Sequence, residues 1–343
     1  MIIFRRVYSS DFPAIYQLAQ TSGVGITTLS KDKKSLEERV TLAAASFDKV
    51  VKAPLNEYYL FVLEETQTQK IVGTAAIEAA TGYATPFYSY KLSQLTQISH
   101  ALDMRYDHKT LNLVNDYQRC SELCTLFLEP AFRANYNGLL LSRARFLFMA
   151  NMPLRFSPTV IAEMRGVSDE EGRAPFWEHV GRHFFNLSFQ EADKLTLATN
   201  KQFIADLMPK EPIYVNLLAQ EAQDVIGKPH ALTLPAMTIL LREGFRYTGY
   251  VDIFDAGPTL EADFDQIKTI NSSKSYSVKV VDTSFEGPTF LLASTQLDFR
   301  AVMGPVVIDA SRKSCTIDKQ TAELLRVEPG HIIRICPLHT DYR

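Results

Sequence analysis

The sequence lacks the features of a nucleic-acid-binding, membrane-spanning or secreted protein. Its 36 basic and 39 acidic residues leave a net charge of −3, so no basic surface for a phosphate backbone is expected. No apolar run approaches the ~18 residues that span a bilayer. The opening MIIFRRVYSSDF does not place a basic region before an apolar one, as a secretory signal does. We therefore expect a cytoplasmic protein with no nucleic-acid partner and no membrane partner.

Cysteine is scarce as well, with four in 343 residues. Four cysteines in this length do not form a disulfide framework. Neither Cys120 nor Cys124 has the Cys-x-x-Cys or histidine spacing of a zinc site. We predict reduced thiols, no metal site and no permanently bound cofactor.

The most informative stretch that is present is residues 121–150, SELCTLFLEPAFRANYNGLLLSRARFLFMA. Residues 122–128 are apolar and β-favourable, and Pro130 closes them, which predicts a strand. Residues 133–138 form a short polar turn, and the apolar spacing from Leu139 onward predicts a helix. Free backbone N–H groups at the helix start, together with the helix dipole, favour an anion such as a pyrophosphate. An ordinary strand–loop–helix connection would show the same pattern.

The rest of the chain predicts an α/β protein, and 343 residues with 46% apolar content favour more than one domain. Strands are expected at 2–7, 58–64, 71–79 and 159–167, helices at 12–20 and 33–47, and strands or an irregular excursion at 94–115. Residues 172–185 predict a helix that ends at Gly181 and an aromatic strand after it. Residues 235–250 repeat this helix–Gly–Phe–strand pattern, and residues 275–343 are β-rich.

An aromatic cluster lies at residues 86–90, where Phe87, Tyr88 and Tyr90 follow one another closely. Such a cluster is more typical of packing or of a dimer contact than of a ligand cage. An apolar aromatic surface of this kind favours a homodimer.

The central stretch resembles the GCN5-related N-acetyltransferase superfamily, whose motif is strand, P-x-x-R-x-x-G-x-G/A, helix. Pro130, Arg133 and Gly138 match the motif, and Tyr136 departs from it at the first glycine. The superfamily's closing pattern matches at Phe176 and Gly181, with Ala174 one residue out of register. Its usual tyrosine is replaced by Trp177, whose indole has no titratable proton to offer.

Longer blocks resemble the arginine N-succinyltransferase family within this superfamily. The blocks are SELCTLFLEP, AEMRGVSDEEG, PFW, LMPKEPIY, EAQDVIG with His230, EGFRY and FDAGPTLE, and the resemblance runs from Arg5 to about Arg334. Departures are Tyr136, Ser30 where the family often has proline, and Pro229-His230 where the histidine is often followed by proline.

The resemblance implies transfer of a succinyl group from succinyl-CoA to the α-amine of L-arginine, the first step of the arginine succinyltransferase catabolic pathway. In the family, the residue matching Leu126 contacts succinyl-CoA, and the residue matching His230 is the proton donor. The loop at residues 21–30 would border the acceptor site through Gly25, Thr27 and Leu29, although the spacing alone favours a flexible helix connection.

The chemistry assigns the remaining candidates. Residues from Tyr136 through Asn137, Gly138 and Leu139, with Arg133, would hold the CoA pyrophosphate, and the Leu126 N–H would stabilise the oxyanion. Arg165, with Arg173 second, is the candidate for the succinyl carboxylate. An ion pair on the sheet face is the alternative for Arg165. Glu122, Glu163, Asp252 and Asp255 are candidates for the acceptor's guanidinium, with Glu163 slightly ahead.

The resemblance also implies the architecture: tandem acetyltransferase-like halves with a mixed, mostly antiparallel sheet. We expect an acyl-CoA-binding domain at 1–190, a second, degenerate half at 191–270 and a small β-rich segment at 271–343. Two other functions remain open. One is succinylation of ornithine, or of both amino acids, and the other is a non-catalytic regulator that binds acyl-CoA.

Overall fold

The computed structural model describes residues 1–22, 28–83, 85–198 and 207–338. Its strands are β1 Ile2–Arg6, β2 Tyr58–Glu65, β3 Lys70–Glu78, β4 Ser89–Ser99, β5 Met104–Val114, β6 Ser121–Leu128, β7 Thr159–Glu163, β8 Ile213–Tyr214, β9 Arg246–Val251, β10 Pro258–Asp263, β11 Lys274–Val281, β12 Thr289–Ser294, β13 Arg300–Pro305, β14 Val307–Asp309, β15 Ser314–Asp318 and β16 Ile332–Pro337. Its helices are α1 Phe12–Thr21, α2 Lys33–Asp48, α3 Asn137–Asn151, α4 Pro175–His179, α5 Gly181–Phe185, α6 Phe189–Ala198, α8 Gln220–Val225, α9 Leu234–Glu243, α10 Lys268–Ser272 and α11 Lys319–Leu325.

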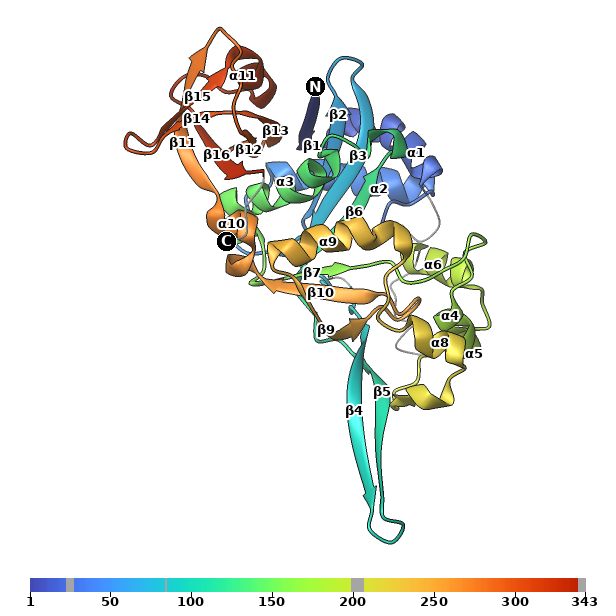
Figure 1. Ribbon diagram of the computed structural model, residues 1–343. Helices are drawn as coiled ribbons and strands as arrows, with labels where there is room; N and C mark the ends of the chain where they lie inside the picture. Colours follow the sequence, from blue (N-terminus) through green and yellow to red (C-terminus); the bar gives the residue numbers. More distant parts are fainter. Residues whose placement is uncertain (23–27, 84, 199–206, 339–343) are drawn as a thin grey trace.

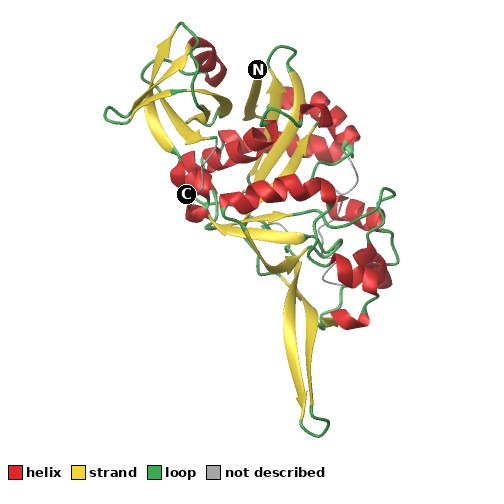
Figure 2. Ribbon diagram, viewed as in Figure 1, coloured by secondary structure: helices red, strands yellow, loops and turns green. Residues whose placement is uncertain are grey.

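The strands form one continuous mixed sheet. Their order is β14-β15-β11-β16-β12-β13-β1-β2-β3-β6-β7-β10-β9-β4-β5-β8. Among the ladders of the described residues, only β6·β7 and β11·β15 are parallel. The predicted mixed, mostly antiparallel sheet is therefore confirmed. Figure 2 shows helices along the central strands and a long hairpin, β4–β5, that projects from them without helices.

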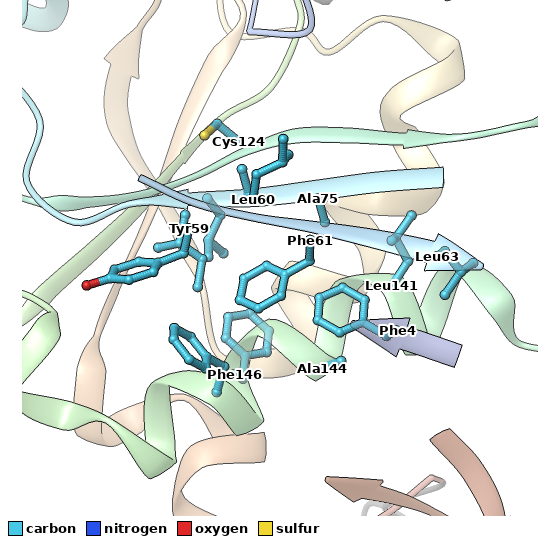
Figure 3. Close-up of a cluster of buried hydrophobic side chains, with 14 of the residues drawn as sticks. Phe4, Tyr59, Leu60, Phe61, Leu63, Ala75, Cys124, Leu141, Ala144 and Phe146 are labelled. Atoms are coloured by element: carbon cyan, nitrogen blue, oxygen red, sulfur yellow. The ribbon is translucent and has the colours of Figure 1, made fainter. Parts of the chain in front are cut away.

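The main core lies between the central strands and α3. Phe4, Tyr59, Phe61 and Phe148 pack ring against ring, with centroids 4.7 Å apart for Phe4–Phe61 and 5.1 Å for Phe61–Phe148. Alternation along β2 sends Tyr59 and Phe61 toward α3, and Leu60 to the opposite face with Cys124 of β6 (Figure 3). Each buried ring stabilises the fold by ~1.5–3 kcal/mol, so this cluster fixes α3 against the sheet.

The segment 191–270 does not form a sheet of its own. Helix α9, Gly244, Phe245 and β9 follow the predicted helix–Gly–Phe–strand order, but β10 then pairs with β7 on one side and with β9 on the other. These strands extend the sheet of the N-terminal segment across the predicted boundary at residue 190. The proposed division of the chain into domains stays a prediction.

Two expectations for residues 159–185 are wrong. Strand β7 ends at Glu163, so Arg165 lies beyond the strand. Residues 181–185 form α5 instead of an aromatic strand. Trp177 is fully buried, stacks on Phe185 and Phe254 with centroids 5.6 and 5.5 Å away, and donates its indole N–H to Leu187 O. It is therefore a packing residue of a helical insertion.

The aromatic cluster at residues 86–90 is internal. Phe87 is 7% exposed and packs with Tyr117 and Ile161, while Tyr90 is fully buried. The surface on which a homodimer was expected is thus occupied by the chain itself. The excursion at 94–115 is the β4–β5 hairpin, whose strands pair over eleven positions from Ser89↔Val114 to Ser99↔Met104.

The C-terminal segment has its own small core, which includes Val278, Leu292, Ile317 and Ile333. It joins the sheet through β13, which pairs with β1. Arg143 of α3 also reaches it, donating to the carbonyl oxygens of Pro337 and Leu338 while pairing with Glu243 at 2.8 Å. Among the described helices, none combines enough length with enough apolar character to cross a bilayer.

Candidate active site

A β-bulge in β6 marks the centre of the candidate site. Thr74 of β3 lies opposite Phe127 and Ala76 opposite Cys124, so Thr125 and Leu126 together oppose the single residue Ala75. Thr125 takes a left-handed conformation with φ of 54°. Its N–H donates to Thr28 Oγ1 at 3.0 Å, and its carbonyl accepts from Thr74 Oγ1 at 3.0 Å. The bulge thus interrupts the regular ladder next to Leu126, the residue predicted to face the thioester.

Strands β6 and β7 separate beside this bulge. They pair only at Ser121↔Val160 and Glu122↔Ile161, although β6 continues to Leu128. Within the described ladders, residues 123–128 have a strand partner on the β3 side alone. The backbone groups of this open edge can bind an extended chain with amide groups, as an added strand would.

A turn with two left-handed residues connects β6 to α3. Asn135 has φ of 51° and Tyr136 φ of 61°, so tyrosine keeps the backbone path for which glycine is the usual residue, at about 1–3 kcal/mol of strain. The Tyr136 side chain is 56% exposed. Asn137 Nδ2 donates to Phe132 O at 3.0 Å, and Arg133 Nε donates to Leu128 O at 3.0 Å. The predicted anion-binding residues Arg133, Tyr136, Asn137, Gly138 and Leu139 therefore lie together where α3 begins.

His230 lies beyond the C-terminal end of β7. The backbone N–H of His230 donates to Arg165 O at 2.8 Å, and Gly166 forms a β-bridge with Pro229. Its Nδ1 accepts from Leu232 N at 3.1 Å. Because a backbone N–H can only donate, Nδ1 must accept, and the neutral ring then carries its proton on Nε2. Burial and the nearby Arg165 lower the pKa of His230, which favours this neutral form.

Beyond Glu122↔Ile161, strands β6 and β7 no longer pair. β7 continues to Glu163, and Arg165, two residues later, holds the backbone of His230 through its carbonyl oxygen. Because β6 and β7 are parallel, the turn before α3 and the segment that holds His230 both follow the C-terminal ends of these strands.

Two of the four acidic candidates are engaged in loop structure. Asp255 accepts from Gly166 N at 2.7 Å and Gly257 N at 2.8 Å, and its burial raises the pKa of its carboxyl well above the usual value. Asp252 Oδ1 accepts from the N–H groups of Phe254 and Asp255. Both carboxyls are used to shape the loop beside His230, which leaves Glu122 and Glu163 as candidates for the guanidinium.

Glu122 belongs to a polar row that the sequence did not reveal. Tyr58, Glu78 and Glu122 lie directly opposite one another on β2, β3 and β6, so they share one face of the sheet. The guanidinium of Arg39 lies 5.2 Å from the Tyr58 ring centroid, and its Nη1 donates to Thr28 O at 3.3 Å. Arg39 and Glu78 are therefore added to the candidate acceptor residues. The sequence offered one signal for this polar row: Glu78 is the charged residue that ends the largely apolar strand β3.

Glu163 and Arg165 are only partly exposed, and each lies near β10 or its loops. Glu163 pairs with Thr259 of β10. Arg165 Nη2 donates to Ser168 Oγ at 2.6 Å, its Nε is buried without a hydrogen-bond partner, and burial lowers its pKa. Among residues 1–22, 28–83, 85–198 and 207–338, no carboxylate forms a salt bridge with Arg165, so the alternative of an ion pair is not observed.

Cys124 is the side chain nearest the bulge with nucleophilic character, but the environment suppresses it. Burial, with Glu122 and Glu78 nearby, raises the pKa of its thiol to about 12. A covalent acyl intermediate on Cys124 is therefore disfavoured, and direct attack by the acceptor amine fits the site better.

Gly25 and Thr27 lie outside the described residues, and Leu29 is buried in the core. No cluster of metal-ligating side chains is found in the described part of the chain.

Comparisons with known proteins identify the family of the chain. Residues 2–269 match the family described as arginine N-succinyltransferase beta subunit, and residues 274–337 match its C-terminal domain. The chain is 43% identical to an arginine N-succinyltransferase of Yersinia pestis over 98% of both chains, and 43% identical to an arginine N-succinyltransferase subunit beta of Pseudomonas aeruginosa over 100% of both.

A solved structure has the same fold. The arginine/ornithine succinyltransferase subunit AI from Pseudomonas aeruginosa superposes with a TM-score of 0.90 and 35% identity, covering 99% of each chain. Together with the match of both family segments, this similarity over the whole length shows that the chain belongs to the arginine N-succinyltransferase family.

Proposed function

We propose that this protein transfers the succinyl group of succinyl-CoA to the α-amine of L-arginine. The observation that carries the proposal is the opening between β6 and β7, with the bulge at Thr125 beside Leu126 and the turn before α3 at one end. The names of the relatives support the same substrates. Succinyl-CoA is a co-substrate consumed in each turnover, with no permanently bound cofactor.

The coenzyme would be held along the open edge of β6. Its pyrophosphate binds at the start of α3, where the helix dipole favours an anion, with Arg133 beside it. The N–H groups of Asn137 and Leu139 there already donate to Ala134 O and Tyr136 O. The pantetheine amides hydrogen-bond to residues 123–128 as an added strand. This pose carries the thioester to Leu126, whose backbone N–H then stabilises the oxyanion. One such donor is typically worth ~10²–10³ in rate.

The reaction forms a carbon–nitrogen bond and breaks a carbon–sulfur bond. The neutral α-amine attacks the thioester carbonyl, the tetrahedral intermediate collapses, and CoA leaves as a thiol. Nε2–H of His230 bonds to the developing thiolate and passes its proton to the sulfur only as the proton lost by the amine replaces it, so the ring stays neutral and charge balances. The Leu232 N–H holds the ring in the tautomer that presents Nε2–H.

Arg165 would receive the succinyl carboxylate, a group that acetyl-CoA lacks. Arg165→Met should therefore lower kcat/KM for succinyl-CoA by ~10- to ~100-fold while leaving the slower reaction with acetyl-CoA nearly unchanged, because one charged hydrogen-bonded contact is worth about 1.5–3 kcal/mol. Steady-state kinetics with both donors measures the ratio. An equal loss with both donors would show that Arg165 only supports the His230 loop.

Glu122 and Glu163 compete for the guanidinium of the acceptor. We place Glu122 first because Glu78 lies directly opposite it on β3, and two opposing carboxylates favour a bound cation. Glu122→Gln should raise the KM for arginine by ~10-fold or more, with the KM for succinyl-CoA unchanged, because an amide keeps the shape and removes the charge. The matched variant Glu163→Gln should change the KM for arginine less. The reverse order would reassign the site to Glu163.

Release of free CoA thiol tests the function directly. The purified protein should release thiol on mixing with succinyl-CoA and arginine, and mass spectrometry should find N-succinylarginine. The solved relative is described as an arginine/ornithine succinyltransferase, so ornithine is the second acceptor to test. No thiol release with any amine would favour a non-catalytic acyl-CoA-binding regulator.

The assembly and compartment complete the proposal. We propose a homodimer that works in a reducing cytoplasm. All four cysteines are free and buried, as expected for a chain that does not depend on disulfides.

A further inference from the structure

The bulge residue Thr125 has a backbone conformation that is unfavourable for threonine. Its φ of 54° is left-handed, a region that the branched Cβ of threonine disfavours sterically. The residue is 4% exposed, so its polar groups need partners within the protein. Strained residues persist where the surrounding structure over-determines them, and they cluster at functional sites. The groups that hold Thr125 are therefore candidates for a functional role.

Hydroxyl groups from three segments hold Thr125. Thr28, which precedes α2, accepts the Thr125 N–H at its Oγ1, 3.0 Å away. Thr74 of β3 donates from its Oγ1 to the Thr125 carbonyl oxygen, also at 3.0 Å. The Tyr58 hydroxyl bonds to Thr125 Oγ1. Because the first two contacts fix the peptide groups on either side of the Thr125 Cα atom, they fix both of its backbone dihedral angles.

The contact from Thr74 sets the direction of the Leu126 N–H. The Thr125 carbonyl and the Leu126 N–H belong to one peptide group, and in a trans peptide these two bonds point in opposite directions. No cis peptide bond occurs among the described residues, so the Leu126 N–H points away from Thr74. Thr74 belongs to β3, which lies beside β6 in the sheet (Figure 1), and the opening to β7 lies on the other side of β6.

Thr28 is held in turn by Arg39 of α2. Arg39 Nη1 donates to the Thr28 carbonyl oxygen at 3.3 Å, and the guanidinium lies 5.2 Å from the centroid of the Tyr58 ring. These contacts connect α2, β2 and β6 around the bulge, and a polar network with paired members is rigid. Since the Thr125 N–H is used in this network, the Leu126 N–H is the bulge donor that remains for the thioester oxygen.

We propose that Thr28 and Thr74 are positioning residues for the transfer reaction. Their hydroxyls fix the two peptide groups of Thr125 and so hold the Leu126 N–H toward the thioester oxygen. They act through the backbone of Thr125. The inference rests on the proposed acyl transfer and adds the groups that keep its oxyanion donor aligned. Alignment matters because a fixed donor does not have to reorganise as charge develops on the oxygen.

Thr28→Val and Thr74→Val remove each hydroxyl and keep the branched shape. Each should lower kcat for succinyl transfer by ~10- to ~100-fold, a part of the ~10²–10³ that one oxyanion donor contributes. The KM values for succinyl-CoA and arginine should stay close to those of the wild type, because the lost contact acts in the transition state. Thr28→Ser and Thr74→Ser keep a hydroxyl and should recover most of kcat. Steady-state thiol release measures all four variants.

The matched control is Ser294→Ala in the C-terminal segment. Ser294 Oγ accepts the Arg300 N–H at 2.9 Å, and Ser294 is 3% exposed, so this variant also leaves a buried N–H without its acceptor. It should lower the unfolding temperature about as much as Thr28→Val while leaving kcat unchanged, with all rates measured well below unfolding. Valine variants that lose stability but keep the wild-type kcat would overturn the proposal. A raised KM for arginine with unchanged kcat in Thr28→Val would place Thr28 in the acceptor pocket instead.

Hydrogen exchange tests the clamp without any substrate. The amide hydrogens of residues 123–128 should exchange faster in Thr28→Val than in the wild type, because the Thr28 hydroxyl protects the Thr125 N–H. Equal exchange would show that this hydrogen bond does not hold the bulge, and the positioning role would fail. If the wild type releases no thiol with any amine, the proposed function fails and this role fails with it. If the wild type is active and both valine variants match its kcat, the positioning role alone fails.

Discussion

Replacing His230 should lower kcat by ~100- to ~1000-fold, because general acid catalysis typically contributes ~10²–10⁴ in rate. The structure separates this role from a structural one. His230 Nδ1 accepts the Leu232 N–H and caps a short 3-10 helix, residues 231–233. His230→Asn can still accept that hydrogen bond through its side-chain oxygen but has no titratable proton. Steady-state rates of thiol release for His230→Asn and His230→Ala give the comparison.

Both variants should be nearly inactive while unfolding at close to the wild-type temperature. His179→Ala is the control, since His179 pairs with Glu221 away from the β6–β7 opening. If His230→Asn retained the wild-type kcat, the histidine would serve only to cap the loop. That outcome would leave the oxyanion contact of Leu126 as the main catalytic element.

The same residue gives a pH signature. Burial and Arg165 lower the pKa of His230 from its usual value near 6.5, and protonation of Nδ1 would break the hydrogen bond from Leu232. In a plot of kcat/KM against pH, the part of the curve that is set by protonation of His230 should therefore lie below pH 6.5. Activity should fall as the pH drops through this range. His230→Asn should lose this dependence on pH.

Substituting Gly257 should have the largest effect on stability. A Cβ at Gly257 would lie 2.0 Å from Met164 O and 2.5 Å from Gly166 N, both backbone atoms. The two loops that hold Asp255 and His230 would have to move apart, so Gly257→Ala should reduce the free energy of unfolding by about 3 kcal/mol. Denaturant unfolding and thiol release should both show the loss, because Arg165 in the displaced loop holds the backbone of His230.

Gly138→Ala is the matched control for this prediction. A Cβ at Gly138 meets only Leu128 Cδ2, at 4.0 Å, and the superfamily motif allows alanine at this position. Its unfolding free energy should stay within about 0.5 kcal/mol of wild type or rise slightly, as helix propensity favours alanine over glycine. Equal destabilisation by the two alanines would show that the predicted backbone clash at Gly257 is relieved by movement.

Part of this arrangement could be read from local sequence. The strand, turn and helix of residues 121–151 follow from short-range patterns, and so do the β2–β3 hairpin and the order of α9, Gly244 and β9. Such elements depend on residues within a few positions of each other. The family was predicted from longer blocks, and the comparisons confirm it over nearly the whole chain.

Other assignments failed or remained open because they depend on pairing between distant segments. Asp255 resembled a substrate-binding carboxylate, yet it accepts hydrogen bonds from Gly166, 89 positions away. Trp177 occupied a motif position but packs in a helical insertion. Strand β10 joins β7 across the predicted boundary, since an exposed strand edge gains hydrogen bonds from whichever strand reaches it.

The sequence by itself determined the family and the strand–turn–helix unit, because motifs and periodicity are properties of neighbouring residues. The role of His230 follows from the family resemblance and stays a prediction. The tertiary structure alone decided where β6 and β7 separate, which carboxyls are engaged in loop structure, and which hydroxyls hold Thr125 at the bulge. These features arise from register and packing between segments far apart in the chain, and no local pattern encodes them.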